Sequence, residues 1–227
     1  RPDSGAISEA LLGAEVAVSL GVKVIEHGPS GPRLGERAAQ FREAFTTTVR
    51  AIRTNVVTTL MQTEASLRNG LMNLDWYASV PGIAGLSARA QGRPAVVVSA
   101  GPSLARNMRL LAEPGVRDRV VIVAVQTVLK QLLAAGIRPH FVTALDHHEI
   151  SRRFYEGLTA ADVEGVTLVV EPKANPAILE AYPGAICCLH DETLTKVLGS
   201  GFAHDGCDIA PGATVAHLAH TFARHLG

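Results

Sequence analysis

Residues 94–104 read Pro-Ala-Val-Val-Val-Ser-Ala-Gly-Pro-Ser-Leu, and this stretch decides the fold. Its apolar, β-branched first half is typical of a short strand buried on both faces of a parallel sheet. The small residues after it predict a turn into a helix, because Gly101 lets a ligand approach the backbone and Pro102 and Ser103 suit a helix start. Since the first N–H groups of a helix lack partners within the helix, we expect a phosphate-sized anion to bind there.

Four more apolar runs follow, and segments with a helical pattern separate them. This alternation is typical of βαβ units and predicts an α/β fold: a Rossmann-like three-layer sandwich with a mostly parallel sheet, preceded by a long helix. The expected strands are 95–100, 120–125, 140–145, 166–170 and 185–189. The expected helices are about 103–112, 127–135, 176–181, 192–198 and 212–226.

The long helix is expected from Glu36 to about Arg68. Its apolar residues recur at steps of three and four, and therefore share one helix face: Ala38, Phe41, Phe45, Val49, Ile52, Val56 and Leu60. Its arginines are predicted to form a solvated face rather than a partner-binding patch: Arg37, Arg42, Arg50 and Arg53. Residues 69–91, which include Trp76 and Tyr77, are predicted to pack between this helix and the sheet.

Residues 8–20 have helical spacing that Gly21 ends, and 22–26 are expected to form a short strand before a Gly/Pro-rich linker. We therefore expect three parts: 1–35 as the remnant of an upstream α/β segment and its linker, 36–91 as a helical segment, and 92–227 as a nucleotide-binding domain. The sequence begins without Met, which predicts a fragment of a longer protein.

The amino-acid composition argues against some classes of binding partner. The 227 residues include 21 basic and 21 acidic side chains, so no net charge favours nucleic acid or an anionic membrane. No apolar stretch approaches the roughly 18 residues that span a bilayer, and no secretory signal is present. The cysteines are Cys187, Cys188 and Cys207, without Cys-x-x-Cys spacing, so we expect small buried thiols and a cytoplasmic protein.

Polar or small side chains follow every expected strand. Ligands of open parallel sheets bind outside the carboxyl ends of the strands, so these segments are expected to build one pocket. The residues concerned are Ser99, Gly101, Pro102 and Ser103 after the first strand, Gln126 and Thr127 after the second, Asp146, His147 and His148 after the third, Glu171 after the fourth, and His190 and Asp191 after the fifth.

Asp146 can hold a cation, orient a sugar hydroxyl or act as a base, and it can equally cap the next helix. His147 and His148 can contact a phosphate or accept a proton near neutral pH, or they are exposed loop residues. Thr214, near the start of the last helix, is placed to meet an anion or to cap that helix.

Several common sites are not expected. The turn at Gly101 lacks the spacing of a dinucleotide-binding loop and the Gly-Lys-Ser/Thr of a P-loop. His217 and His220 share one helix face, but the sequence shows no H-E-x-x-H arrangement, so no metal site is predicted.

Three motifs in order resemble the bacterial motility accessory factor (Maf) proteins and the related MptE-like domain (6-hydroxymethylpterin diphosphokinase MptE-like). They are residues 99–104, 121–127 and 136–146, and the turn at 212–216 adds to them. The resemblance covers about 92–227 and implies a sialyltransferase-like fold. It also implies a CMP-activated nonulosonic acid donor, of pseudaminic or legionaminic type, whose sugar is placed on flagellin serines and threonines.

On this resemblance, Gly101, Pro102 and Ser103 border the nucleotide phosphate, and Gln126 and Thr127 line the nucleotide or sugar pocket. Asp146 is the acidic group of the third strand end, and Thr214 faces the donor. Ser99 and Glu171 are also predicted to bind the donor, because of their places at strand ends. Ser99 stands where the family commonly has glycine, and His140 where an aspartate is usual. The family's next strand would begin beyond Gly227, which makes the domain incomplete at its C-terminal end.

The leading hypothesis is a glycosyltransferase in which Asp146 or His148 assists the acceptor hydroxyl while loop N–H groups stabilise the leaving phosphate. It needs a CMP-sugar donor, a protein acceptor such as flagellin, and no firmly implied cofactor. One alternative is pyrophosphoryl transfer from ATP with magnesium, for which residues 145–148 offer a single aspartate. Another is a non-catalytic module for assembly with flagellar or cell-envelope biosynthesis partners.

Overall fold

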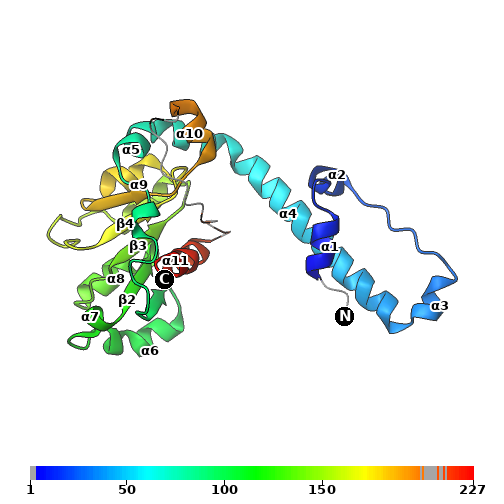
Figure 1. Cartoon of the computed structure of the whole chain (residues 1–227), viewed down its shortest axis with the longest axis horizontal. Coiled ribbons are helices and arrows are strands. Elements are labelled where there is room, and N and C mark those ends of the chain that lie inside the picture. Colours follow the sequence, from blue (N-terminus) through cyan, green and yellow to red (C-terminus); the bar gives the residue numbers. More distant parts are fainter. Residues whose placement is uncertain (1–3, 200, 202–208, 210–211, 213) are drawn as a thin grey trace. The chain divides into compact units, whose positions relative to one another are not determined.

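The computed structural model describes residues 4–199, 201, 209, 212 and 214–227. The chain divides into two compact units, Arg1–Glu64 and Ala65–Gly227 (Figure 1). No helix of the described residues is long and apolar enough to cross a membrane.

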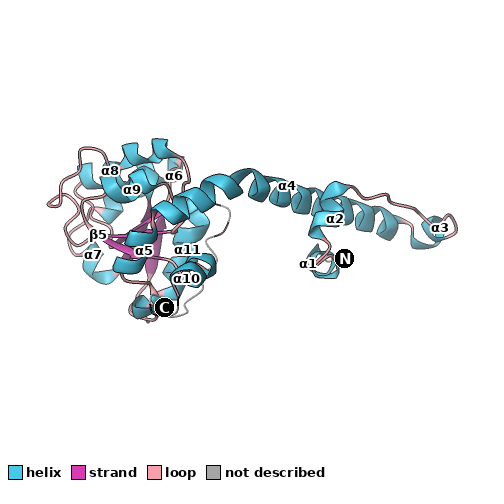
Figure 2. Cartoon of the chain, turned by 90° about the horizontal axis from the view of Figure 1, so that it is seen from above, coloured by secondary structure: helices cyan, strands magenta, loops and turns pink. Residues whose placement is uncertain are grey.

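A five-stranded, all-parallel sheet in the order β1-β2-β3-β4-β5 forms the centre of Ala65–Gly227 (Figure 2). Its strands are β1 (Ala95–Val98), β2 (Val121–Val125), β3 (Phe141–Ala144), β4 (Thr167–Val170) and β5 (Ala185–Cys188). All five expected strands are therefore confirmed. Three of them, β1, β3 and β5, end one or two residues earlier than expected, and β2 and β4 end where expected.

Helices cover both faces of this sheet, which confirms the α/β fold class. One face packs against α6 (Pro102–Leu111) and α11 (Val215–His225), and its core includes Ile122 and Phe222. The other face packs against α8 (Leu129–Ala134) and α9 (Pro176–Ala181). Between and after the strands lie also α7 (Val116–Arg119), α10 (Glu192–Leu198) and the 3₁₀ turns η2 (Gln126–Val128) and η3 (Glu149–Phe154).

The long helix is confirmed as α4 (Glu36–Met72), and α5 (Leu74–Ser79) and η1 (Ala84–Leu86) follow it. Tyr77 of α5 is fully buried, and its hydroxyl lies 2.8 Å from Thr195 Oγ1 and accepts the Asp191 N–H at 3.0 Å. This contact fastens α5 to α10, so the expected packing role of this segment is confirmed.

The prediction of one continuous helix over residues 8–20 is wrong, because the helix is interrupted at its centre. Two short helices replace it, α1 (Ser4–Ala10) and α2 (Glu15–Leu20), because Gly13 adopts a φ of +80° between them. The strand expected at 22–26 is also wrong. This segment pairs with no described strand, and its apolar side chains stay exposed, so neither a hydrogen-bonded ladder nor burial holds it extended. A short helix, α3 (Ser30–Leu34), lies in the expected linker.

The two described cysteines, Cys187 and Cys188, are buried free thiols of β5, as expected. Burial raises the pKa of Cys188 to about 12 and also raises that of Cys187, so both stay protonated. Cys207 lies outside the described residues.

Candidate functional site

Asp146 is held in a fixed position just after β3. Its Oδ2 accepts a short hydrogen bond from Gln126 Nε2 and another from Ser151 Oγ at 2.7 Å. Gln126 Oε1 in turn accepts from the Tyr155 hydroxyl at 3.1 Å. Burial raises the pKa of Tyr155 well above its ordinary value, with Tyr182 and Asp146 acting in the same direction, so the phenol keeps the proton that it donates. A buried chain of donors thus orients the carboxylate.

The structure brings Gln126 and Asp146 together, but Gln126 lies in the interior. Its side chain is 0% exposed and both of its amide atoms are engaged. It therefore acts on the site through Asp146, and a direct contact with a ligand stays a prediction. Asp146 is partly exposed, and its Oδ1 accepts no hydrogen bond from the part of the chain that the structure describes. This oxygen is free to accept a ligand hydroxyl.

The two histidines after Asp146 lie side by side. The ring centroids of His147 and His148 are 3.9 Å apart. Burial is the main cause that lowers the pKa of His147. The charge of His148 lowers it further, and the charge of Asp146 acts in the opposite direction. His147 is therefore neutral at pH 7. His148 is exposed. A neutral imidazole beside an oriented carboxylate is suited to accepting a proton from a hydroxyl.

Two asparagines that the sequence analysis missed hold the loops after β3 and β4. Asn69 Nδ2 donates to the main-chain oxygens of His147 at 3.1 Å and Lys173 at 3.2 Å. Asn73 Nδ2 donates to those of Pro172 at 2.7 Å and Ala174 at 2.8 Å. No local pattern marks either residue, because Asn69 lies in the last turn of α4 and Asn73 lies just beyond its end.

The turn after β1 has the open helix start that the sequence predicts. Gly101 is the N-cap of α6, and no side chain of the described residues caps the helix. In contrast, the side chains of Asn175, Asp191 and Thr214 cap α9, α10 and α11. Ser103 is thus not an N-cap. The first-turn N–H groups of α6 carry the positive end of the helix dipole toward a possible anion.

Gly101 leaves room for such an anion. Its φ of −179° is extended backbone that any residue adopts, and a Cβ there would meet nothing nearer than Ser103 Oγ at 4.0 Å. The fold itself therefore does not require glycine. A hollow of about 130 Å³ lies between β1 and α6, and Ser99, Ser103 and Asn107 are among its lining residues.

Glu171 follows β4, the neighbour of β3, and its N–H donates to the Ala144 oxygen at 3.0 Å. No side-chain hydrogen bond or ion pair between described residues joins Glu171 or Thr214 to the Asp146 network. Burial raises the pKa of Glu171, although Lys173 opposes the shift. Lys173 Nζ pairs instead with Asp191 Oδ2 at 2.7 Å. Thr214 Oγ1 accepts from the His217 N–H at 3.3 Å, so its oxygen serves its own helix.

The remaining predicted residues are Thr127 and Pro102. Thr127 is exposed in η2, and Pro102 is the first residue of α6. Their contacts with a donor, like those of Glu171 and Thr214, stay predictions. No three His, Cys, Asp or Glu residues of the described chain are grouped so that they could hold a metal ion.

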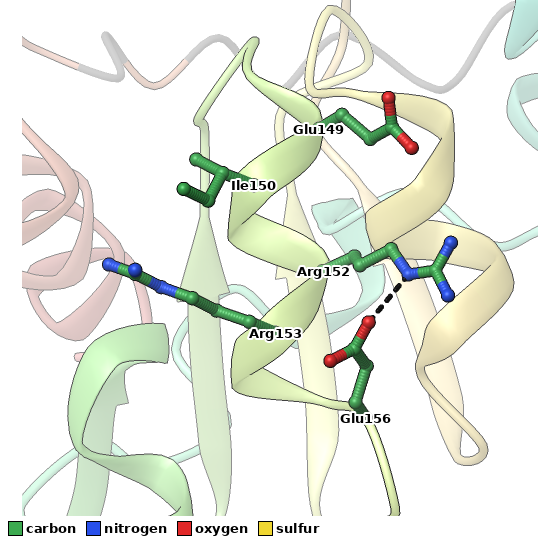
Figure 3. A pocket seen from close by; sticks show the side chains of 5 residues that line it. All are labelled: Glu149, Ile150, Arg152, Arg153 and Glu156. Carbon is green, nitrogen blue, oxygen red and sulfur yellow. Dashed lines mark hydrogen bonds and ion pairs between the residues drawn. The ribbon is translucent and has the colours of Figure 1, made fainter.

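A second hollow, of about 360 Å³, lies beside η3 (Figure 3). Arg152 Nε pairs with Glu156 Oε1 at 2.8 Å on one side, and Arg153 points the other way. All of its lining residues come from one segment, and the paired side chains are half exposed. It is a surface feature next to the Asp146 loop rather than part of the strand ends.

The chain is similar to one known family and to one solved structure. Residues 68–227 match the family described as 6-hydroxymethylpterin diphosphokinase MptE-like. The fold is similar to the solved structure of a Maf glycosyltransferase from Magnetospirillum magneticum AMB-1, with a TM-score of 0.56 and 17% identity. This similarity covers 100% of the present chain and 35% of that one. No curated protein matches the sequence.

Proposed function

Because the chain belongs to the 6-hydroxymethylpterin diphosphokinase MptE-like family, we propose that it is the nucleotide-binding part of a glycosyltransferase. In this proposal it transfers a nonulosonic acid, of pseudaminic or legionaminic type, from a CMP-activated donor to a serine or threonine hydroxyl of a protein such as flagellin. The observation that carries the proposal is the oriented Asp146 carboxylate beside the pair His147 and His148.

The donor phosphate would bind at the start of α6. Pro102 has no N–H and the Leu104 N–H donates to the Gly101 oxygen at 3.0 Å, so the Ser103 N–H would be the first-turn donor to the phosphate, with space beside it at Gly101. When the bond between sugar and phosphate breaks, negative charge grows on the departing CMP. Fixed N–H donors and the helix dipole stabilise that charge without reorganising.

The acceptor hydroxyl would bind at Asp146. Its free Oδ1 accepts the hydrogen bond of the hydroxyl while Oδ2 stays held by Gln126 and Ser151. His148, which is exposed, then takes the proton as the hydroxyl oxygen attacks the sugar. Proton removal by a positioned base typically contributes a factor of about 10²–10⁴ to a rate.

Pyrophosphoryl transfer from ATP is the second candidate, and the family description, which names a diphosphokinase, favours it. That reaction needs magnesium, which prefers oxygen ligands. The loop after β3 supplies one carboxylate, and one of its two oxygens is already engaged. Formation of AMP from ATP and a reduced pterin would support this candidate over glycosyl transfer.

Calorimetry with CMP tests the donor site. We expect CMP to bind the full-length protein and Gly101→Ala to weaken binding at least about tenfold, because the added methyl group occupies the space beside the phosphate. Gly85→Ala is the matched control, since Gly85 is exposed and has open space around it. Absence of CMP binding, or equal effects of the two substitutions, would contradict the proposal.

A transfer assay tests Asp146. We expect Asp146→Asn to lower the rate of sugar transfer roughly hundredfold while CMP still binds, because the substitution removes the charge at the acceptor side only. If flagellin glycosylation in a deletion strain is restored in full by Asp146→Ala, a non-catalytic assembly role replaces the enzymatic one.

A further inference from the structure

The loop after β4, residues 171–175, is fastened to the loop that carries Asp146. The N–H of Asn175 donates to the Asp146 main-chain oxygen at 2.8 Å, and Asn175 Nδ2 donates to the His147 oxygen at 3.3 Å. The N–H of Glu171 donates to the main-chain oxygen of the last β3 residue at 3.0 Å. The loop after β4 therefore belongs to the same sheet edge as Asp146, the edge at which ligands of open parallel sheets bind.

Lys173 of this loop is held in place and keeps donors to spare. Its main-chain oxygen accepts from Asn69 Nδ2 at 3.2 Å, and its Cγ lies 3.8 Å from the position that a Cβ on Gly70 would take. Its Nζ pairs with Asp191 Oδ2 at 2.7 Å, and its side chain is 32% exposed. No other hydrogen bond or ion pair of Nζ is made within the described part of the chain. Because an ammonium group has three N–H donors, donors remain for a ligand.

Glu171 lacks a partner of this kind. Its side chain is part-buried, and no described residue donates a hydrogen bond to its carboxyl group or forms an ion pair with it. Burial raises the pKa of Glu171, the charge of Lys173 acts in the opposite direction, and the charge of Asp191 raises it further. A part-buried carboxyl group without a donor is unfavourable for folding, and groups of this kind gather at functional sites.

We propose that Lys173 and Glu171 together bind the sugar of the donor, through a hydroxyl or acylamino group that the sugar carries. This inference rests on the proposed function and adds a sugar subsite to it. An O–H or N–H of the sugar donates to the Glu171 carboxyl group, while a neighbouring oxygen of the sugar accepts from Lys173 Nζ. Each of the two protein groups thereby gains the kind of partner that it lacks.

The order of the groups along the sheet edge favours the sugar over the ribose of the nucleotide. Neighbouring strands are about 4.8 Å apart, so the ends of β3 and β4 lie roughly 10 Å and 14 Å from the end of β1. In the proposed reaction the phosphate binds at Ser103, after β1, and the acceptor hydroxyl binds at Asp146, after β3. The attacked carbon of the sugar lies between them, and the rest of its carbon chain extends toward β4. The ribose is joined to the far side of the phosphate.

Calorimetry of the full-length protein with CMP, CMP-pseudaminic acid and CMP-legionaminic acid tests this subsite. We expect Lys173→Met and Glu171→Gln each to weaken binding of the preferred CMP-sugar at least about tenfold and that of CMP less than about twofold. Lys196→Met is the matched control, because Lys196 pairs with Glu192 at 2.6 Å on the exposed surface of α10. Equal losses of CMP and CMP-sugar affinity would place the ribose at this pair, and unchanged CMP-sugar affinity would leave the pair without a ligand. Either result would overturn the inference.

Urea unfolding separates a binding role from a structural one. Glu171→Gln removes a part-buried charge, so its urea midpoint should equal or exceed that of the wild type. A lower midpoint would show that the fold needs the carboxylate and would overturn the inference. Lys173→Met leaves Asp191, whose side chain is 9% exposed, without its cation. If that variant does not fold, Glu171→Gln decides alone.

The wild-type titrations distinguish this inference from the proposed function. If the wild type does not bind CMP, the proposed function is contradicted and the sugar subsite with it. If the wild type binds CMP but binds neither CMP-sugar more tightly, the sugar subsite alone is contradicted.

Discussion

Two phenylalanine pairs of this chain lie in opposite surroundings. In Ala65–Gly227 the rings of Phe141 and Phe222 pack edge to face at 5.0 Å, and Phe222 is fully buried. In Arg1–Glu64 the rings of Phe41 and Phe45 stack at 5.9 Å, and Phe41 is 52% exposed. The difference holds for each unit as a whole. The sheet domain buries almost all of its large strand residues, whereas Ile7 and Val18 are the buried large apolar residues among those described in Arg1–Glu64.

This comparison indicates where the stabilising free energy arises. Apolar burial has to offset the conformational entropy of ordering a chain, and the sheet domain has a core on each face to do so. Arg1–Glu64 has little buried apolar surface of its own. Its stability must depend on helical hydrogen bonds within α4 and on whatever covers the stripe of apolar residues along that helix.

Truncating one phenylalanine to alanine in each unit is the most direct test of this difference. Phe222→Ala is expected to lower the free energy of unfolding by about 3–5 kcal/mol, because it leaves a cavity in a closed core. Phe41→Ala, the matched change, should cost under about 1 kcal/mol, because Phe41 is already half in water. Urea unfolding followed by circular dichroism measures both, and equal costs would refute the contrast.

A second test uses two asparagines of one helix. Asn69→Ala should cost about 1–3 kcal/mol, because two main-chain carbonyl groups, of His147 and Lys173, lose a donor. Asn55→Ala, at an exposed position of α4 in Arg1–Glu64, should change stability by less than about 0.5 kcal/mol. Hydrogen exchange at residues 146–149 should accelerate in Asn69→Ala alone. Unchanged exchange there would show that Asn69 does not hold the loop.

The smallest expected effect is a pH dependence of the sheet domain. His140 Nδ1 accepts the Ile122 N–H at 3.1 Å and so must be unprotonated. Burial, then Arg117 and Arg93, lowers the pKa of His140, against the opposing effect of Asp118. The unfolded chain takes up a proton near pH 6.5 and the folded chain only at lower pH. This stabilisation is therefore complete above about pH 6.5 and lost as the pH falls through the lowered pKa.

His140→Asn keeps a neutral acceptor for the Ile122 N–H but cannot be protonated. Between pH 8 and pH 5 the free energy of unfolding should therefore fall by about 1 kcal/mol less in the variant than in the wild type, measured from the urea midpoints. His147, whose pKa is also lowered, acts in the same direction but is present in both proteins. His27→Ala, at an exposed position in Arg1–Glu64, is the control. A variant as pH-dependent as the wild type would show that His140 is not responsible.

Much of the sheet domain could be predicted from residues 94–227. Short β-branched runs bounded by turn residues identified all five strands, and three ordered motifs identified the family that the match over 68–227 confirms. The sequence also picked out Gln126 and Asp146, which a hydrogen bond joins, as candidate site residues. It missed their donors Ser151 and Tyr155 and the clamping Asn69, because serine, tyrosine and asparagine outside a motif carry no local signal of what they contact.

Prediction was poorest where local pattern was the only guide. Residues 22–26 are β-branched and apolar enough for a strand, but a strand is stable only when a neighbour accepts its hydrogen bonds, and no described segment does so. The apolar periodicity of α4 predicted its length well. It did not predict that the face would be left partly exposed, because burial depends on what packs against a helix.

The sequence by itself determined the order of elements, the parallel sheet and the long helix, because hydrophobic periodicity and turn residues act over a few neighbouring positions. Only the tertiary structure decided that Gln126 turns inward to orient Asp146, that α6 starts without a cap while α9, α10 and α11 are capped, and that Phe41 and Leu60 of the α4 stripe stay exposed. These features depend on contacts between residues far apart in the chain, and no local pattern specifies such contacts.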